Sequence, residues 1–143
     1  MGWIYDFSGM KEVAESLSRN DNENIKLMIV GEGNLYKLLN KMKSGNNLNE
    51  KLILTGKISF EEIPKHIASA DICLLPAYKN EIMMNIVPIK IYEYMAMGKP
   101  VIATNLPGLK KKFGNNNGII YISKILSRLW KKQFIFMKNY MVK

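Results

Sequence analysis

Short apolar runs, most of them closed by glycine or proline, alternate with helix-like segments along most of this 143-residue chain. Runs of this length, bounded by turn residues, are typical of strands buried in a parallel sheet. The alternation predicts βαβ units with right-handed crossovers, an α/β class, and a Rossmann-like parallel sheet with helices on both faces. The expected strands are residues 1–5, 25–30, 52–55, 71–76, 100–104 and 118–122, and the expected helices are 10–17, 34–42, 61–70 and 88–97.

The loops of such a sheet are where a ligand is expected. In open α/β sheets, ligands bind beyond the carboxyl ends of the strands. Two long connections lie there, an irregular loop at 77–87 and a Gly/Lys/Asn loop at 106–117 with room for a short helix. The loops after the strands at 1–5, 25–30, 71–76 and 100–104 are therefore the first places to search.

Composition narrows the class of protein. An apolar fraction of 48% and a charged fraction of 23% are ordinary for a globular domain and argue against intrinsic disorder. A single cysteine excludes a disulfide framework within the chain and makes a reducing, cytoplasmic setting the default. The first residues have neither the basic nor the apolar region of a secretory signal. The expected localisation is cytoplasmic.

Positive charge is concentrated in the last third of the chain. Of 21 basic side chains, 10 follow Glu93 and no acidic one does. The segment 123–143 interleaves lysines with apolar and aromatic residues near helical spacing. We favour a helix that docks its aromatic stripe on the domain, with lysines in solvent. A peripheral contact with an anionic membrane remains open, whereas a nucleic-acid partner is not expected.

Several common motifs are absent or weak. The turn Gly31-Glu32-Gly33 lacks the third glycine of a dinucleotide fingerprint, because Tyr36 stands there, so a plain tight turn is favoured. His66 has no nucleophile near it in the sequence, and Cys73 is centred in an apolar strand. No Cys/His cluster has metal-ligand spacing. We therefore expect no catalytic residue and no metal site in this chain.

The helix expected at 88–97 is the most informative segment. A helix N-terminus offers unpaired N–H groups that suit a phosphate, and Pro88 fits its first turn. Lys90 adds a cation where the helix dipole disfavours one unless an anion is bound. Glu93 lies three residues further on the same face. On spacing alone, a weak Lys90–Glu93 surface pair is the favoured interpretation.

The pattern Pro88-x-Lys90-x-x-Glu93-Tyr-Met-Ala-x-Gly98-Lys-Pro-Val-Ile-Ala resembles the donor-site signature of group 1 retaining glycosyltransferases of the GT-B fold. Further segments resemble the family in the expected order. These are the IVGEG turn at 29–33, LTG at 54–56, ASADICLLP at 68–76 and NGII at 117–120. The resemblance covers about residues 1–122, and implies the C-terminal, nucleotide-sugar donor domain of that fold.

The resemblance also implies which residues contact the donor. Glu93 would bind the ribose hydroxyls, and Lys90 would neutralise the diphosphate. Backbone amides around Pro88 and Ile89 would face the same diphosphate. The turn Gly56–Ile58, and Ile58 within it, would lie near the base, and the loop at Gly2 would pass close to the phosphates.

Two departures from the family pattern concern charge. The family commonly has two glutamates seven residues apart. Glu93 matches the second, whereas Asn85 stands at the first, and Glu81 lies four residues too early. Trp3 and Ser8 stand where many members have an arginine and a lysine that contact the diphosphate. Asn85 can still form a hydrogen bond with a sugar hydroxyl, but it carries no charge.

A third departure concerns domain organisation. In the family an acceptor domain precedes the donor domain, and this chain opens inside the donor domain's first strand. The sequence thus predicts a donor-binding domain at 1–122 with a truncated first strand, a basic tail at 123–143, and no acceptor domain. The expected partners are a nucleoside diphosphate sugar, as donor substrate, and a separate acceptor-domain chain. No cofactor is expected.

The predicted function is donor binding for transfer of a sugar from a nucleoside diphosphate sugar to a hydroxyl acceptor. The mechanism would be retaining and metal-independent, and the chain alone would be inactive. Two alternatives remain open. One is a non-enzymatic nucleotide- or partner-binding module, either a split-enzyme subunit or a decaying gene product. The other is a basic protein that binds anionic membranes.

Overall fold

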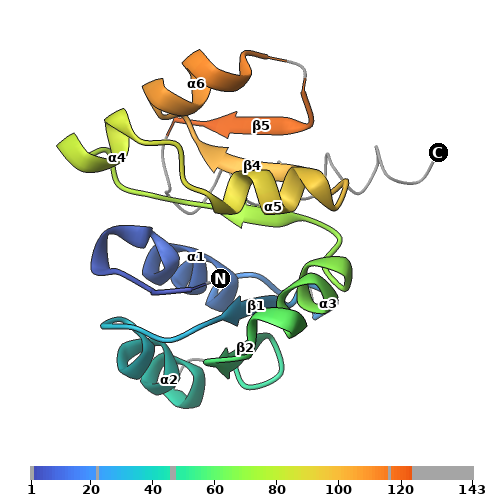
Figure 1. Cartoon of the computed structure of the whole chain (residues 1–143). Helices are drawn as coiled ribbons and strands as arrows, with labels where there is room; N and C mark the ends of the chain where they lie inside the picture. Colours follow the sequence, from blue (N-terminus) through green and yellow to red (C-terminus); the bar gives the residue numbers. More distant parts are fainter. Residues whose placement is uncertain (1, 22, 46–47, 116, 124–143) are drawn as a thin grey trace.

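The structure is a computed structural model that describes residues 2–21, 23–45, 48–115 and 117–123. Helices and strands alternate along it, as the apolar runs predict (Figure 1). The predicted tail, apart from Ser123, lies outside the described residues. The elements are η1 (Asp6–Ser8), α1 (Met10–Ser18), β1 (Leu27–Val30), α2 (Tyr36–Gly45), β2 (Leu52–Gly56), η2 (Phe60–Glu62), α3 (Ile63–Ala68), β3 (Cys73–Leu75), α4 (Glu81–Asn85), α5 (Lys90–Ala96), β4 (Val101–Thr104), α6 (Pro107–Phe113) and β5 (Ile119–Ile122).

The strands form two parallel sheets, β1-β2 and β3-β4-β5. Placed side by side, they give the order β2-β1 and then β3-β4-β5. That is the order of a doubly wound sheet whose central first strand is not present among the described residues. The α/β class and the Rossmann-like arrangement are confirmed, but the sheet is in two pieces.

Residues 2–5 are not a strand, and the prediction of one there is wrong. The Ile4 N–H donates to the Glu32 carbonyl oxygen at 2.8 Å, and the Ile4 carbonyl oxygen accepts from the Leu35 N–H at 3.3 Å. The segment therefore pairs with the turn that follows β1. That turn admits it only because of its glycines: a Cβ at Gly31 would lie 2.0 Å from the Gly2 carbonyl oxygen.

The loop expected at 77–87 contains a helix, so the prediction of an irregular loop is also wrong. Asn80 caps α4, because its Oδ1 accepts from the Met83 N–H at 2.7 Å. With five residues, α4 is too short to display a helical period in the sequence. The loop at 106–117 does contain the expected short helix, α6.

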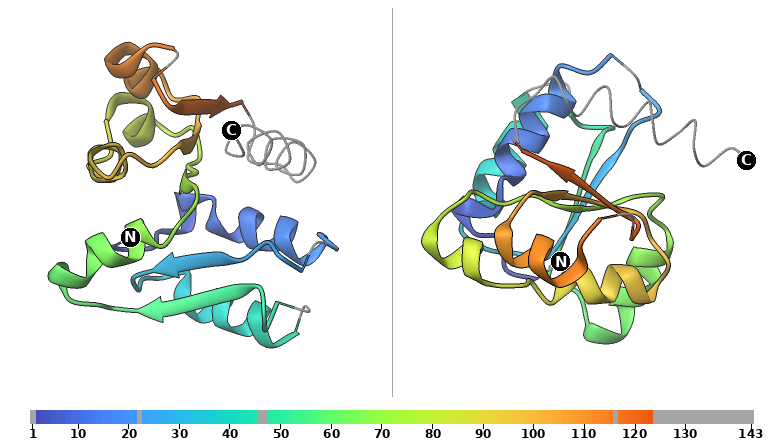
Figure 2. Two further views of the ribbon diagram at one scale, coloured as in Figure 1. Left: turned by 90° about the vertical axis from the view of Figure 1, so that its right-hand side faces the viewer. Right: turned by 90° about the horizontal axis from the view of Figure 1, so that it is seen from above.

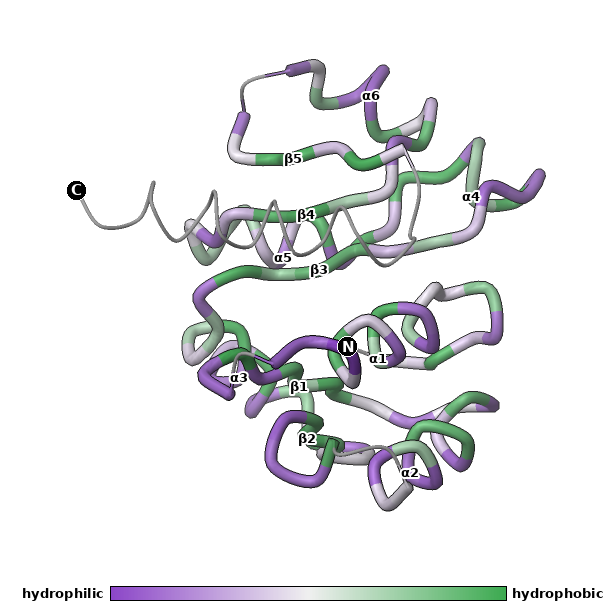
Figure 3. The backbone as a smooth tube through the Cα atoms, turned by 180° about the vertical axis from the view of Figure 1, so that it is seen from behind, coloured by the Kyte–Doolittle hydropathy of each residue, from purple (hydrophilic) through white to green (hydrophobic). Residues whose placement is uncertain are grey.

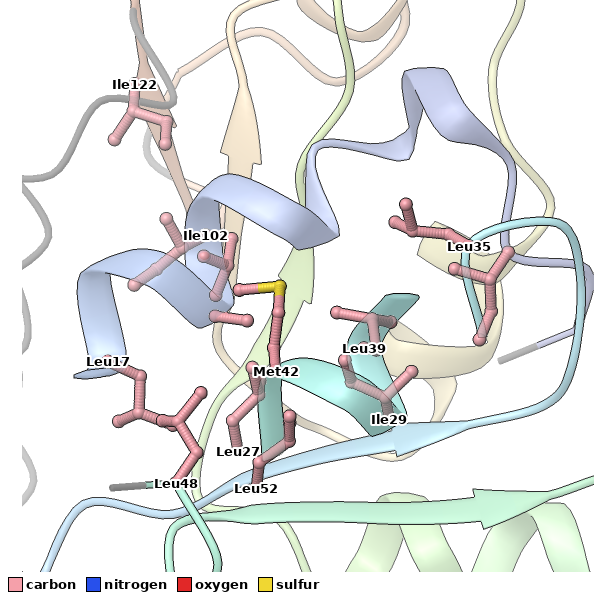
Figure 4. Close-up of a cluster of buried hydrophobic side chains, with 13 residues drawn as sticks. Leu17, Leu27, Ile29, Leu35, Leu39, Met42, Leu48, Leu52, Ile102 and Ile122 are labelled. Atoms are coloured by element: carbon pink, nitrogen blue, oxygen red, sulfur yellow. The ribbon is translucent and has the colours of Figure 1, made fainter. Parts of the chain in front are cut away.

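The core has two layers, one on each face of the sheets (Figure 2). The first layer joins α1 and α2 to both sheets, with Leu17, Met42 and Leu52 packed in the same cluster as Ile102 (Figure 4). The second joins α3, α5 and α6 to the three-stranded sheet. Successive residues of β4 alternate between the layers, as a strand covered on both faces requires. None of the helices in the described ranges is long and apolar enough to cross a membrane.

The loop after β3 ties η1 and α1 to the three-stranded sheet. The Tyr78 N–H donates to the Phe7 carbonyl oxygen at 2.9 Å, and the Tyr78 hydroxyl donates to the Glu12 carboxylate. On its other side, the Ala77 N–H donates to the Thr104 hydroxyl at 3.0 Å. This loop leads to α4 and α5, so these bonds position the segment on which the candidate site lies.

Candidate functional site

The start of α5 is fixed by its buried face. Ile91 and Tyr94 are 0% and 6% exposed and belong to the core layer under the three-stranded sheet. The turn begins at Pro88, whose carbonyl oxygen accepts from the Ile91 N–H at 3.1 Å, although the regular helix is shorter than predicted. Lys90 and Glu93 are both partly buried on this helix. The sequence thus places both predicted donor contacts in one turn held rigidly by the core.

Lys90 is a partly buried cation in the first turn of α5. Burial lowers the pKa of its ammonium, while the charge of Glu93 opposes that shift. The two side chains do not form an ion pair. The ion pairs within 4.0 Å in the described ranges are Lys11–Glu15 and Arg19–Glu15. The surface Lys90–Glu93 pair, favoured on spacing alone, is therefore not formed, and the charge of Lys90 stays available for an anion.

The first loop approaches the same lysine. Gly2 has φ +92°, and a Cβ there would lie 3.8 Å from Cε of Lys90. The structure thus brings together Gly2 and Lys90, both predicted to lie near the donor phosphates. The turn at Gly31 and Gly33 supports this arrangement, because a Cβ at Gly33 would lie 2.5 Å from the Ile4 backbone. The sequence predicts only a tight turn there. The turn also makes room for the Ile4 backbone, a contact that the sequence pattern does not show.

The other predicted contacts lie on separate elements. Asn85 ends α4 and is exposed, and its Nδ2 donates to the Glu81 carbonyl oxygen at 2.9 Å. Its side-chain oxygen has no protein partner among the described residues. Ile89 is 73% exposed beside the partly buried Pro88. Ile58 is partly buried in the loop that follows β2.

Gly108 is a site-positioning residue that sequence reasoning missed. A Cβ on it would lie 2.8 Å from the Ile86 carbonyl oxygen, so the loop between α4 and α5 packs directly on the α6 backbone. This contact sets how far the segment that leads to Pro88 lies from α6. The dipeptide Pro107-Gly108 at a helix start was the available signal, since a glycine inside a helix needs a packing reason.

His66 and Cys73 are the two side chains for which the sequence analysis expects no catalytic role. His66 is partly buried, and its Nδ1 lies 2.9 Å from the Glu62 carbonyl oxygen. Cys73 is 5% exposed, and burial raises the pKa of its thiol to about 11. In the described part of the chain, no three His, Cys, Asp or Glu side chains gather as metal ligands would.

Comparison with known proteins gives related sequences. TuaH of Bacillus subtilis is 35% identical over 60 residues, which are 42% of this chain and 15% of TuaH. The alpha-D-kanosaminyltransferase of Streptomyces kanamyceticus is 29% identical over 100 residues, which are 70% of this chain and 24% of that enzyme. The chain therefore spans about a quarter or less of the length of these two relatives.

Solved structures give the fold. The C-terminal domain of LpcC, a group 1 glycosyl transferase of Francisella tularensis, superposes with a TM-score of 0.77 at 18% identity, covering 97% of this chain and 73% of that one. HepE of Anabaena, in complex with UDP-glucose, gives a TM-score of 0.74 at 17% identity, with 98% and 39% covered. The sequence profile of the family described as "Glycosyl transferases group 1" matches residues 7–128. This chain belongs to the group 1 glycosyl transferases and has the fold of their C-terminal domain.

Proposed function

We propose that this chain binds a nucleoside diphosphate sugar as the donor half of a glycosyltransferase. The observation that carries the proposal is the environment of Lys90. It is a partly buried cation beside Gly2, in the first turn of α5, and its charge is not consumed by Glu93. A bound anion would stabilise such a group. Family membership, and the UDP-glucose bound to the similar HepE structure, favour a donor diphosphate as that anion.

Each predicted residue has a role in this proposal. The Lys90 ammonium faces the diphosphate, and the Ile89 N–H and the backbone at Pro88 and Gly2 line the same position. Glu93 accepts hydrogen bonds from the ribose hydroxyls, which a carboxylate can do in pairs. The remaining two are more distant contacts. Ile58 packs near the base, and the free side-chain oxygen of Asn85 accepts from a sugar hydroxyl.

The chemistry that this half supplies is electrostatic. When the bond between the anomeric carbon and the diphosphate breaks, negative charge grows on the leaving phosphate oxygen. Lys90, held in place before the reaction, stabilises that charge. In this proposal the transfer is retaining. It needs no metal ion, because a lysine and backbone N–H groups stabilise the charge of the diphosphate.

A panel of nucleotides tests the binding function. UDP, GDP and ADP, each with and without a sugar, are added to the chain, and thermal unfolding is followed. A ligand at 100 times its Kd stabilises the folded chain by about 2.7 kcal/mol, which is a readily measured shift. We expect one base to be preferred and Lys90→Gln to reduce its shift strongly. If none of these compounds shifts the unfolding of a cooperatively folded chain, the proposal is wrong.

The second part of the proposal is that the chain alone does not transfer sugar. Holding two substrates together can contribute about 7–11 kcal/mol toward the barrier, and we propose that a second domain holds the acceptor. Purified chain should at most hydrolyse a bound donor slowly, which radiolabelled donor sugar would reveal. Transfer of that label to an added acceptor, absent in the Lys90→Gln control, would contradict this part.

A further inference from the structure

The loop that opens the described chain carries three aromatic side chains. Trp3 and Tyr5 are 51% and 47% exposed, whereas Ile4 between them is 5% exposed and belongs to the core. Because neighbouring side chains of an extended segment point to opposite sides, Trp3 and Tyr5 point away from the core. Phe7 comes next and is partly buried. Two large aromatic surfaces are therefore presented to solvent from one short segment.

Tyr5 and Phe7 form a parallel stack. Their ring centroids are 4.9 Å apart, and their ring planes differ by 8°. One face of the Tyr5 ring therefore rests on Phe7, and the half-exposed Tyr5 offers its other face to solvent. Because this ring is already supported, a ligand that stacks on it has little further structure to order. We call these two rings the Tyr5 platform.

The Tyr5 platform is held next to the candidate site by contacts within the described chain. The Tyr78 N–H donates to the Phe7 carbonyl oxygen at 2.9 Å, and Tyr78 begins the segment that leads to α4 and α5. Tyr5 follows Gly2 by three residues, so their Cα atoms are at most about 11 Å apart. A Cβ on Gly2 would in turn lie 3.8 Å from Cε of Lys90. Figures 1 and 3 both show the loop that precedes α1 at the same end of the molecule as α4.

The charge of this loop favours a ligand with hydroxyl groups. Asp6 is the one charged side chain among residues 2–9, it is exposed, and it takes part in none of the ion pairs of the described ranges. A carboxylate accepts hydrogen bonds from hydroxyl groups, and it repels phosphate and sulfate. A loop that offers an aromatic ring face and a free carboxylate therefore suits an uncharged, hydroxyl-rich ligand with one apolar face.

We propose that the Tyr5 platform binds a sugar ring of the acceptor, so that the acceptor of this glycosyltransferase is a saccharide. The axial C–H groups of a pyranose form an apolar, weakly positive face that fits the negative face of an aromatic ring. Its hydroxyl groups lie around the edge of the ring, where they can donate to Asp6. The inference rests on the proposed function, because it names the acceptor class for the same site.

A nucleobase is the rival ligand, because bases also stack on aromatic rings. In the proposed complex, however, the base lies near Ile58, in the loop after β2. The Tyr5 platform is bonded instead to the loop after β3, through Tyr78. The two positions belong to different loops, which favours a saccharide on the platform.

Saturation-transfer NMR on the intact chain tests the proposal in the absence of nucleotide. The probes are maltotriose, cellotriose and N,N′,N″-triacetylchitotriose, and glycerol is the control because it has hydroxyl groups but no ring. Saturation of the aromatic protons should reach the ring C–H protons of at least one trisaccharide and should not reach glycerol. Titration of the signal gives a Kd for the trisaccharide that binds.

Matched variants locate the bound sugar. Tyr5→Ala should raise the Kd about tenfold or more, whereas Tyr5→Phe should keep it, because stacking requires the ring and not its hydroxyl. Tyr92→Ala is the control, since Tyr92 is 44% exposed and also contacts a ring, that of Phe113, but at a tilt of 58°. It should leave the Kd unchanged.

A second pair of variants tests the carboxylate. Asp6→Ala should raise the Kd about threefold or more, because it removes a hydrogen-bond acceptor. Asp71→Ala removes another exposed carboxylate, on the loop before β3, and should leave the Kd unchanged.

The proposal is wrong if none of the three trisaccharides receives saturation, or if a folded Tyr5→Ala binds as tightly as the unaltered chain. It is also wrong if uridine, guanosine or adenosine displaces the bound trisaccharide, which would make the platform a base site. If Tyr5→Ala does not fold, the comparison of Asp6→Ala with Asp71→Ala decides. The trisaccharide titrations contain no nucleotide, so their failure would leave the proposed function standing, and a failure of nucleotide binding would leave these titrations unaffected.

Discussion

Gly2 and Lys90 lie side by side, because a Cβ added to Gly2 would sit 3.8 Å from Cε of Lys90. The contact joins the start of the described chain to the first turn of α5. The Lys90 side chain is partly buried there, and Glu93 is not close enough to form an ion pair. A bound anion would pair with the Lys90 charge. The first two predictions follow from this pair and its neighbour Glu93.

Lys90→Gln should weaken the binding of a nucleoside diphosphate more than that of the nucleoside. The amide keeps the number of heavy atoms in the side chain but loses the charge that we propose to face the diphosphate, and charged hydrogen bonds contribute about 1.5–3 kcal/mol. Titration calorimetry with the preferred nucleoside and its diphosphate measures both losses. Equal losses for the two ligands would show that Lys90 does not face the diphosphate.

Glu93→Gln should cost about 1–3 kcal/mol of nucleotide affinity, because in the proposed complex the carboxylate accepts from the ribose hydroxyls. The matched ligand is the 2′,3′-dideoxy nucleotide, which lacks both hydroxyls. The unaltered chain should bind it as weakly as the variant binds the normal nucleotide, and the variant should lose little more. Additive losses from the two changes would place Glu93 away from the ribose.

Much of the fold was predictable because each strand is a compact apolar run between turn residues. β1, β2, β4 and β5 all lie within or within one residue of the predicted ranges. The apolar pattern of residues 2–5 was misleading, because it predicted a strand that is not formed. Trp3, Ile4 and Tyr5 are apolar like a strand, but the backbone of Ile4 forms its hydrogen bonds with the turn after β1. A local pattern cannot show whether a neighbouring strand is available, and no described strand pairs with residues 2–5.

The sequence singles out the residues of the candidate site but not the contacts between them. Lys90 and Glu93 stand out by their place in a helix and a family signature. Whether they pair with each other depends on side-chain positions that no spacing fixes, and the structure separates them. Gly108 gave almost no signal, because its role depends on the carbonyl oxygen of Ile86, which lies on a different segment.

Gly108→Ala should destabilise the chain by about 1–3 kcal/mol, against the usual direction for a glycine in a helix. The added methyl would lie 2.8 Å from the Ile86 carbonyl oxygen and push away the loop that leads to Pro88. Gly45→Ala is the matched control, since nothing lies within 4 Å of a Cβ there, and it should stabilise by about 0.4–1 kcal/mol. Urea unfolding measures both. A neutral Gly108→Ala would show that the loop moves aside at no cost.

Tyr78→Phe should destabilise the chain at neutral pH by about 0.5–1 kcal/mol, a small effect because the phenol is 41% exposed and screened by water. Its hydroxyl donates to Glu12, and this bond, with burial, raises the pKa of Tyr78 from 10.0 to about 12. The bond requires the protonated phenol, so its contribution is complete below about pH 10 and disappears as the pH rises toward 12.

The difference in unfolding free energy between the unaltered chain and Tyr78→Phe should therefore shrink over that interval. Tyr92→Phe is the control. Tyr92 is exposed to a similar extent, at 44%, but it packs its ring on Phe113 at 5.5 Å between centroids, a contact that phenylalanine keeps. Denaturant unfolding at several pH values follows both variants. If the difference in unfolding free energy for Tyr78→Phe stays constant from pH 8 to pH 12, the hydroxyl does not donate to Glu12. The loop after β3 would then be held on this side by its backbone bond to Phe7 alone.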